Sequence, residues 1–289
     1  MKLTILGSGS PEAYARRASS GYLLEVAGQR ILFDCGGGVV SRLVEAGFRP
    51  SDIDYLFFTH LHSDHMMDYA RLVHAAWDEG GKPLKVFGPE PIKDITEKLF
   101  GRDGVFAHDL IARTELKGSQ EVWIARGGTL PRPWPAPEVT EIEPGFTFEG
   151  DSWSLASCSV PHAQPYLTCM AFSVTGEGEK FVYSGDAGLT DQLEVLAKDA
   201  DLLLHWCYRL SDDTNVSQFM CETAPTPPEI ASVAERAGVC QLILTHFRVH
   251  MDESDRHKQA LKNLRDGFSG KSGIAEDLEV YSVSIDKSD

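Results

Sequence analysis

The sequence predicts an αββα sandwich, in which two mixed β-sheets pack face to face and helices cover both outer faces. Short apolar runs typical of buried strands occur in both halves of the chain, and runs with helical spacing are interleaved with them. Four of the apolar runs end in a histidine or an aspartate, so their polar ends can converge on one edge of a sandwich. Since no low-complexity linker divides the 289 residues, we expect a single domain over 1–289.

The N-terminal half supplies the first series of strands and helices. We expect strands at 2–6, 21–26, 30–34, 53–58 and 83–87, and helices from the glycines 36–38 to about 47, at 66–78 and at 89–100. Gly47 and Pro50 are helix stop signals. In the helix 66–78, apolar residues recur at Met67, Ala70 and Val73, which is the spacing of one buried helical face.

Residues 101–137 break this alternation. Four prolines stand at alternate positions from Pro131 to Pro137, so that part must be extended and cannot join a central strand ladder. Long irregular insertions in compact domains are usually lids, binding loops or oligomer arms. We therefore expect 101–137 to form a wall of the substrate pocket or a dimer arm.

Strands dominate the C-terminal half. They are expected at 139–143, 152–160, 166–174, 180–183, 201–205, 240–245 and 278–283, with helices at 190–198, 227–237 and about 254–268. The helix 227–237 begins at a proline, which suits the first turn of a helix. The interleaving of strands and helices in both halves completes the pattern of the sandwich.

Composition bounds the class of protein. The chain carries 27 basic and 43 acidic side chains, a formal net charge of −16, which repels phosphate backbones at long range and makes nucleic acid an unlikely partner. No stretch approaches the ~18 apolar residues of a membrane span, and the N-terminus lacks the apolar core of a signal peptide. The six cysteines are scattered, without a CxxC pair, as in a reduced intracellular protein. We expect a cytoplasmic protein with no membrane association.

The segment from Thr59 to His65 carries the strongest chemical signal. It places three histidines and an aspartate within six positions, directly after the apolar run 53–58. Imidazole and carboxylate are the ligands that zinc, iron and manganese prefer. In an extended segment His60 and His62 point the same way, while Asp64 and His65 lie where the chain turns and can face a second ion. The segment therefore predicts half of a two-metal site.

The motif HxHxDH after a hydrophobic strand resembles the signature of the metallo-β-lactamase fold, and three later motifs follow in the order of that family. These motifs are Val160-Pro161-His162, Tyr183-Ser184-Gly185-Asp186 and Leu244-Thr245-His246-Phe247. The opening Leu6-Gly7-Ser8-Gly9-Ser10-Pro11 and the Leu-Thr-His-Phe ending look most like the ribonuclease Z and arylsulfatase-like branch. The resemblance covers nearly the whole chain.

The resemblance also implies a complete set of metal ligands. The matching positions are His60, His62 and His162 for the first metal, Asp64, His65 and His246 for the second, and Asp186 for the bridging carboxylate. Two divalent ions are therefore expected, with Zn²⁺ ahead of Mn²⁺ or iron. Such a pair, roughly 3.5–4 Å apart, activates a bridging water or hydroxide without a nucleophilic serine or cysteine.

Three further residues are candidates for proton transfer. Asp64, beside the bridging oxygen, is a candidate proton acceptor. A general acid is sought among histidines outside the ligand set. His205 ends the apolar strand 201–205, and His250 follows the last ligand by four residues. Either could protonate the leaving group or contact the substrate.

The chain departs from ribonuclease Z in two motifs. In that family the strand ending at His205 continues as His-Glu-Ala-Thr, whereas here it reads His205-Trp206-Cys207-Tyr208, and His-Ser-Thr appears as Ala224-Pro225-Thr226. The glutamate and its histidine partner are gone, and 101–137 lacks the basic Gly/Pro-rich arm that holds transfer RNA. Trp206 and Tyr208 instead predict an aromatic wall for a smaller substrate.

We therefore expect a dinuclear metal-dependent hydrolase that attacks a small ester-like molecule. Phosphodiester, sulfate ester and lactone all remain open, because the metals activate water in the same way for each. The chief alternative is a ribonuclease Z-type endoribonuclease that processes tRNA 3′ ends. A metal-bearing scaffold without turnover and an oxidative non-haem iron site are further alternatives. A homodimer is the expected assembly.

Overall fold

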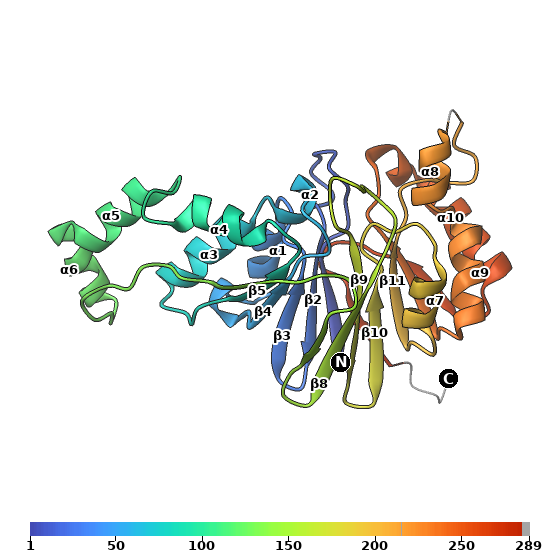
Figure 1. The fold of residues 1–289 in the computed structure, drawn as a ribbon. Helices are drawn as coiled ribbons and strands as arrows, with labels where there is room; N and C mark the ends of the chain where they lie inside the picture. Colours follow the sequence, from blue (N-terminus) through green and yellow to red (C-terminus); the bar gives the residue numbers. More distant parts are fainter. Residues whose placement is uncertain (215, 285–289) are drawn as a thin grey trace.

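The computed structural model describes residues 1–214 and 216–284, and it confirms the αββα sandwich (Figure 1). The described strands form two seven-stranded sheets. The first sheet contains, in spatial order, β14 (Val280–Ser282), β1 (Lys2–Gly7), β2 (Gly21–Val26), β3 (Gln29–Phe33), β4 (Tyr55–Phe57), β5 (Lys85–Gly88) and β6 (Glu138–Glu141). The second contains β13 (Lys271–Ile274), β12 (Gln241–Thr245), β11 (Leu202–Trp206), β10 (Glu179–Tyr183), β9 (Met170–Gly176), β8 (Trp153–Ser159) and β7 (Thr147–Glu149).

The two sheets share one pattern of pairing. The antiparallel pairs are β14–β1, β1–β2 and β2–β3 in the first sheet and β7–β8, β8–β9 and β9–β10 in the second. The remaining pairs, from β3 to β6 and from β10 to β13, are parallel. Parallel neighbours need long crossovers, which is why the helices follow the parallel strands.

The helices fall into three groups along the chain. Those that connect strands of the first sheet are α1 (Val39–Glu45), η1 (Pro50–Asp52), α2 (Ser63–Met66), α3 (Tyr69–Asp78) and α4 (Ile92–Phe100). Those of the inserted segment are α5 (Ala107–Glu115) and α6 (Lys117–Ala125). Those associated with the second sheet are α7 (Asp191–Ala197), α8 (Gln218–Thr223), α9 (Pro227–Ala237), η2 (Val249–Asp252) and α10 (Ser254–Gly267). None of these described helices is long and apolar enough to cross a membrane.

Strand side chains alternate between two kinds of core. On β4, Tyr55 and Phe57 face the aromatic core between the sheets, whereas Leu56 packs with the helices outside the first sheet. On β11, Leu202 and Leu204 join the same central core, whereas Leu203 packs with the outer core around α9 and α10. Because the period of a strand is two, a strand that is apolar at every position is buried on both faces.

The inserted segment differs from its prediction. Residues 101–137 were expected to be irregular, but they contain α5 and α6, which lie at the end of the molecule remote from β10 and β11 (Figure 1). Helix α6 buries none of its residues, so it lacks the apolar stripe by which a helix is recognised in sequence. The proline run 131–137 lies outside the described helices and strands. The role of 101–137 as a pocket wall or dimer arm stays a prediction.

Candidate metal centre

The strands that carry the candidate ligands deliver them to one edge of the sandwich. Strand β10 is parallel to β11 and β12, and β8 shares this direction because both β8 and β10 are antiparallel to β9. The ligands His162, Asp186 and His246 follow the C-terminal ends of β8, β10 and β12. The loop after β4 in the other sheet is tied to them by the Met170 N–H, which donates to the Thr59 carbonyl at 3.0 Å.

The loop after β4 changes conformation between its two pairs of ligands. His60 and His62 precede a helix, and His62 is extended (φ −65°, ψ 151°). Asp64 and His65 lie within the short helix α2, where both are buried. Because the backbone changes from extended to helical within residues 59–65, the two pairs of side chains join different clusters. The binding of two ions by these clusters stays a prediction.

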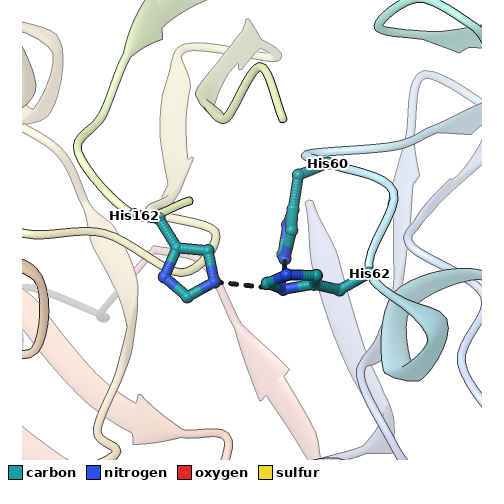
Figure 2. A group of neighbouring side chains, drawn as sticks. All are labelled: His60, His62 and His162. Atoms are coloured by element: carbon teal, nitrogen blue, oxygen red, sulfur yellow. Dashed lines mark hydrogen bonds between the residues drawn. The ribbon is translucent and has the colours of Figure 1, made fainter. Parts of the chain in front are cut away.

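The first group of ligands consists of three imidazoles, from His60, His62 and His162 (Figure 2). The distance from His60 Nε2 to His62 Nδ1 is 3.0 Å, and that from His162 Nε2 to the same Nδ1 is 3.2 Å. His60 and His62 come from the loop after β4 and His162 from the loop after β8. The three ring nitrogens therefore converge from both sheets.

The second group joins Asp64, His65 and His246, and Asp186 lies between the groups. Nε2 of His246 is 3.1 Å from Asp64 Oδ2 and 3.2 Å from Asp186 Oδ2. Asp186 also reaches His65 Nε2 at 3.4 Å through Oδ1 and His162 Nε2 at 3.6 Å through Oδ2. Its carboxylate thus touches a ligand of each group, the position that a bridging carboxylate requires.

The donor atoms fit two divalent metal ions. Two nitrogens held 2.0–2.1 Å from one tetrahedral ion lie about 3.3–3.4 Å apart, close to the separations observed here. His65 Nε2 and Asp186 Oδ1 are buried and have no hydrogen-bond partner among the described residues. Buried polar atoms normally have hydrogen-bond partners. The unpartnered His65 Nε2 and Asp186 Oδ1 therefore indicate a binding position for a cation that both atoms could contact.

Burial and neighbouring charge divide the ligands into two electrostatic classes. Burial lowers the pKa of His60 well below its ordinary value and that of His162 to about 4, so both rings are neutral ligands at pH 7. Burial would also lower the pKa of His65, but the carboxylates of Asp186 and Asp34 hold it well above the ordinary value. Burial would raise the pKa of Asp186, yet the imidazoles of His246 and His65 hold it well below. A metal ion that binds the second group would therefore displace protons from its imidazoles.

A buried carboxylate that the sequence analysis did not single out orients two of the ligands. Asp34 Oδ2 accepts from His65 Nδ1–H at 2.8 Å and from the Thr59 hydroxyl at 2.9 Å. Since that hydroxyl gives its only proton to Asp34, it must accept from His60 Nδ1–H at 3.0 Å. Both rings are thus held in the tautomer that leaves Nε2 free for a metal.

The remaining contacts of Asp34 explain how it is held. Its Oδ1 accepts from the Thr59 N–H at 2.8 Å, and its Oδ2 also accepts from the Tyr183 hydroxyl at 2.9 Å. Asp34 has a φ of 58°, in the left-handed region that aspartate tolerates better than most residues. The available signal was its position: an acidic residue directly after an apolar strand, like the ligands themselves.

His205 is buried, with 1% of its surface exposed. Its Nδ1–H donates to the Trp206 carbonyl at 2.8 Å, and its Nε2 has no partner among the described residues. Burial lowers the pKa of His205 to about 4, against the opposing effect of Asp186. The ring is therefore neutral at pH 7 with a free lone pair on Nε2. Its role as a donor or general acid stays a prediction.

The three predicted substrate residues occupy different environments. Trp206 is 3% exposed, and its indole N–H donates to the Ala187 carbonyl. Its ring stands edge-on to the rings of His162 and His246, with centroids 5.1 and 5.6 Å away. Tyr208 is half-buried and stacks on Trp206. His250 instead lies near Asp213, with its Nε2 3.7 Å from a carboxylate oxygen. Substrate contact by these residues stays a prediction.

Comparisons with known proteins agree with this geometry. Residues 14–219 match the family described as the metallo-beta-lactamase superfamily. Ribonuclease Z of Mycobacterium bovis (strain BCG / Pasteur 1173P2) is 28% identical, over 98% of both chains. Ribonuclease Z of Mycobacterium sp. (strain KMS) is 31% identical, over 86% of this chain and 84% of its own. The solved structure of the short form of human tRNase Z superposes with a TM-score of 0.70 at 21% identity, over 99% and 100% of the two chains.

These relatives contradict one expectation from the sequence. Nucleic acid was expected to be an unlikely partner because the net charge is −16, yet the relatives that span this chain are named ribonucleases Z. Net charge is a sum over the whole surface, and exposed charges farther than about 8–10 Å from a site are largely screened. The overall acidity therefore does not decide what binds beside a dinuclear centre.

The complete ligand set and the match over most of the chain lead to the same conclusion. This protein belongs to the metallo-β-lactamase superfamily, as a metal-binding hydrolase homologous to ribonuclease Z.

Proposed function

We propose that this protein is a ribonuclease Z-type endoribonuclease that hydrolyses a phosphodiester bond of RNA at the dinuclear centre. The observation that carries the proposal is the match to ribonucleases Z over nearly the whole chain, together with the seven converging ligands. When bound, two divalent ions supply Lewis acidity, which acidifies a water molecule and offsets the charge that develops on an attacked phosphate.

The protein's own groups bind, orient and exchange protons. His60, His62 and His162 would hold one ion, and Asp64, His65 and His246 the other, with Asp186 shared. We propose Zn²⁺, because its coordination suits imidazole and carboxylate donors at these separations.

Two side chains are proposed to handle protons. The ionised carboxylate of Asp64 can accept a hydrogen bond from the attacking water. Burial would raise the pKa of Asp64, but its hydrogen bond with His246 and the nearby imidazole of His65 lower it. We propose that His205 donates to the leaving oxygen once its unpartnered Nε2 is protonated, which a neighbouring anionic phosphate would favour.

A second candidate function is hydrolysis of a small ester-like molecule: a phosphodiester, a sulfate ester or a lactone. The observation that favours it lies at the motif that departs from ribonuclease Z. Thr226 is the N-cap of α9, and its hydroxyl and N–H both bond to Glu229 in a capping box. It therefore serves the helix and does not replace the histidine that ribonuclease Z carries there.

The two candidates are separated by assaying metal-reconstituted protein on a precursor tRNA with a 3′ trailer, and on bis(4-nitrophenyl) phosphate, an aryl sulfate and a lactone. Ribonuclease Z is the positive control, and Asp186→Asn, which removes the shared carboxylate charge, is the negative one. We expect endonucleolytic removal of the trailer at a rate comparable to the positive control. Turnover of small esters with an intact precursor would overturn the proposal in favour of the second candidate.

A further inference from the structure

A stacked column of side chains leads from the metal ligands to a guanidinium group. Tyr208 packs against Trp206, with ring centroids 5.7 Å apart and planes 24° from parallel. It also packs against Arg248, whose guanidinium carbon is 5.1 Å from the tyrosine centroid. The Tyr208 centroid is 6.0 Å from that of the ligand His246. Since Trp206 also packs against His246, the column places a cation beside the metal centre.

The guanidinium of Arg248 is incompletely satisfied. It makes one hydrogen bond among the described residues, from Nη2 to Glu12 Oε1, and at 3.4 Å this is longer than the 2.7–2.9 Å of a good charge-assisted bond. Its Nε is buried and has no partner among the described residues. Arginine has five N–H donors in a planar fork, so most of its capacity remains free.

Glu12 neutralises this cation only in part. Its other oxygen, Oε2, accepts a hydrogen bond from the Val249 N–H at 2.7 Å, so the backbone of η2 holds the carboxylate in place. An anion that approached the free side of the guanidinium could form two parallel bonds, as phosphate does with arginine. Stacking on Tyr208 holds the fork in one plane before the anion arrives.

We propose that Arg248, held by Tyr208, is a subsite for a backbone phosphate next to the one that is cleaved. The inference rests on the proposed function, because a second phosphate so close to the reacting one belongs to a polynucleotide. Arg248 is therefore a binding and specificity residue, and Glu12 is an internal competitor for its charge. The scissile phosphate binds at the metals, and Arg248 binds its neighbour.

The proposal predicts opposite effects for two substitutions. Arg248→Met removes the charged bonds and should raise KM for a short RNA substrate about 10- to 100-fold with little change in kcat, because binding is lost equally in ground and transition states. Glu12→Gln keeps an oxygen for the Val249 N–H but removes the competing charge, and should lower KM. Arg248→Lys should recover only part of the loss, because lysine lacks the fork.

The decisive experiment pairs these variants with RNA in which a single flanking phosphate is replaced by an uncharged methylphosphonate, on either side of the cleaved bond. One of the two replacements should raise the KM of wild-type protein but leave the KM of Arg248→Met unchanged. The reason is that the replacement and the substitution remove the two partners of one interaction, between Arg248 and the flanking phosphate. Bis(4-nitrophenyl) phosphate, which has no flanking phosphate, should be affected far less by the variant. Arg236→Met, at the exposed Arg236–Glu194 ion pair, is the matched control.

The outcomes distinguish failure of the subsite from failure of the proposed function. If Arg248→Met equals wild type on RNA, or responds to both methylphosphonates as wild type does, the subsite is overturned while the proposed function stands. If wild-type protein hydrolyses bis(4-nitrophenyl) phosphate but no RNA, the proposed function fails and the subsite fails with it. Metal content and thermal midpoint, unchanged in Arg248→Met, separate a binding defect from misfolding.

Discussion

Asp34 and His65 form a buried pair in which the carboxylate accepts from Nδ1 of the ring at 2.8 Å, and both side chains are fully buried. This contact engages Nδ1 of the candidate ligand His65 and leaves its Nε2 free for an ion. Through Thr59 the same carboxylate also determines the tautomer of His60. One fully buried carboxylate therefore orients a candidate ligand in each metal group.

We predict that Asp34→Asn weakens the binding of both ions. An amide cannot accept hydrogen bonds from the His65 ring and the Thr59 hydroxyl as the carboxylate does. Loss of such an outer partner typically costs 10–100-fold in metal affinity. Titration of chelator-treated protein with zinc, followed by elemental analysis, measures the change. Tyr183→Phe, which removes one donor to Asp34 but leaves the carboxylate, should have a smaller effect. Equal affinity in Asp34→Asn and wild type would contradict the orienting role.

The convergence of the seven candidate ligands could be predicted because each follows an apolar strand or lies in one short motif. Asp34 also follows an apolar strand, but its orienting role could not be predicted, because that role appears only in contacts with residues 25 and 31 positions away. Helix α6 was missed for another reason: it buries none of its residues, so packing imposes no apolar stripe on its sequence. Helix α5, which was also missed, buries Ala107 and Leu110. The spacing of apolar residues predicts helices and strands that have a buried face, and it gives no signal for an element that is exposed on all sides.

The protein should bind two transition-metal ions per chain. His62→Ala should weaken mainly the ion held with His60 and His162, and His246→Ala mainly the ion held with Asp64 and His65, because each histidine belongs to one group. Elemental analysis and competition with a chromogenic chelator measure each stoichiometry. Wild-type protein that takes up a single ion under saturating zinc and manganese would rule out the dinuclear centre.

Proton release should distinguish the two ions. His65 and His246 have a raised pKa, so they hold protons at pH values where free imidazole has lost them, and metal uptake must expel those protons. His60, His62 and His162 have a lowered pKa and are already neutral at pH 7. The affinity of the second group should therefore rise with pH through and above the ordinary histidine range, while that of the first stays flat.

Calorimetry in buffers of different ionisation enthalpy counts these protons. His62→Ala and His246→Ala allow the two groups to be titrated one at a time. About one or more protons should be released when the Asp64 group fills, and close to none when the His60 group fills. Equal release from both groups would contradict the electrostatic division of the site.

His205 is predicted to assist the leaving group. His205→Ala should retain both metals and the fold, while turnover of a substrate with a poor leaving group falls by roughly 10²–10⁴-fold, the usual contribution of general acid–base catalysis. The loss should shrink for 4-nitrophenyl esters, whose leaving group needs little protonation. Because burial lowers the pKa of His205 to about 4, a proton-donating role also predicts that activity declines as the pH rises, with a steeper decline for the poor leaving group.

The competing account is a purely structural histidine that bonds the Trp206 carbonyl, and a matched variant tests it. His74 is only partly buried, but like His205 it has an Nε2 with no partner among the described residues, and it packs against Phe100 and Phe106 away from the candidate ligands. His74→Ala should lower the thermal midpoint without changing turnover per metal-loaded molecule. If His205→Ala behaves in the same way, with an unaltered pH profile and no dependence on the leaving group, His205 has no catalytic role.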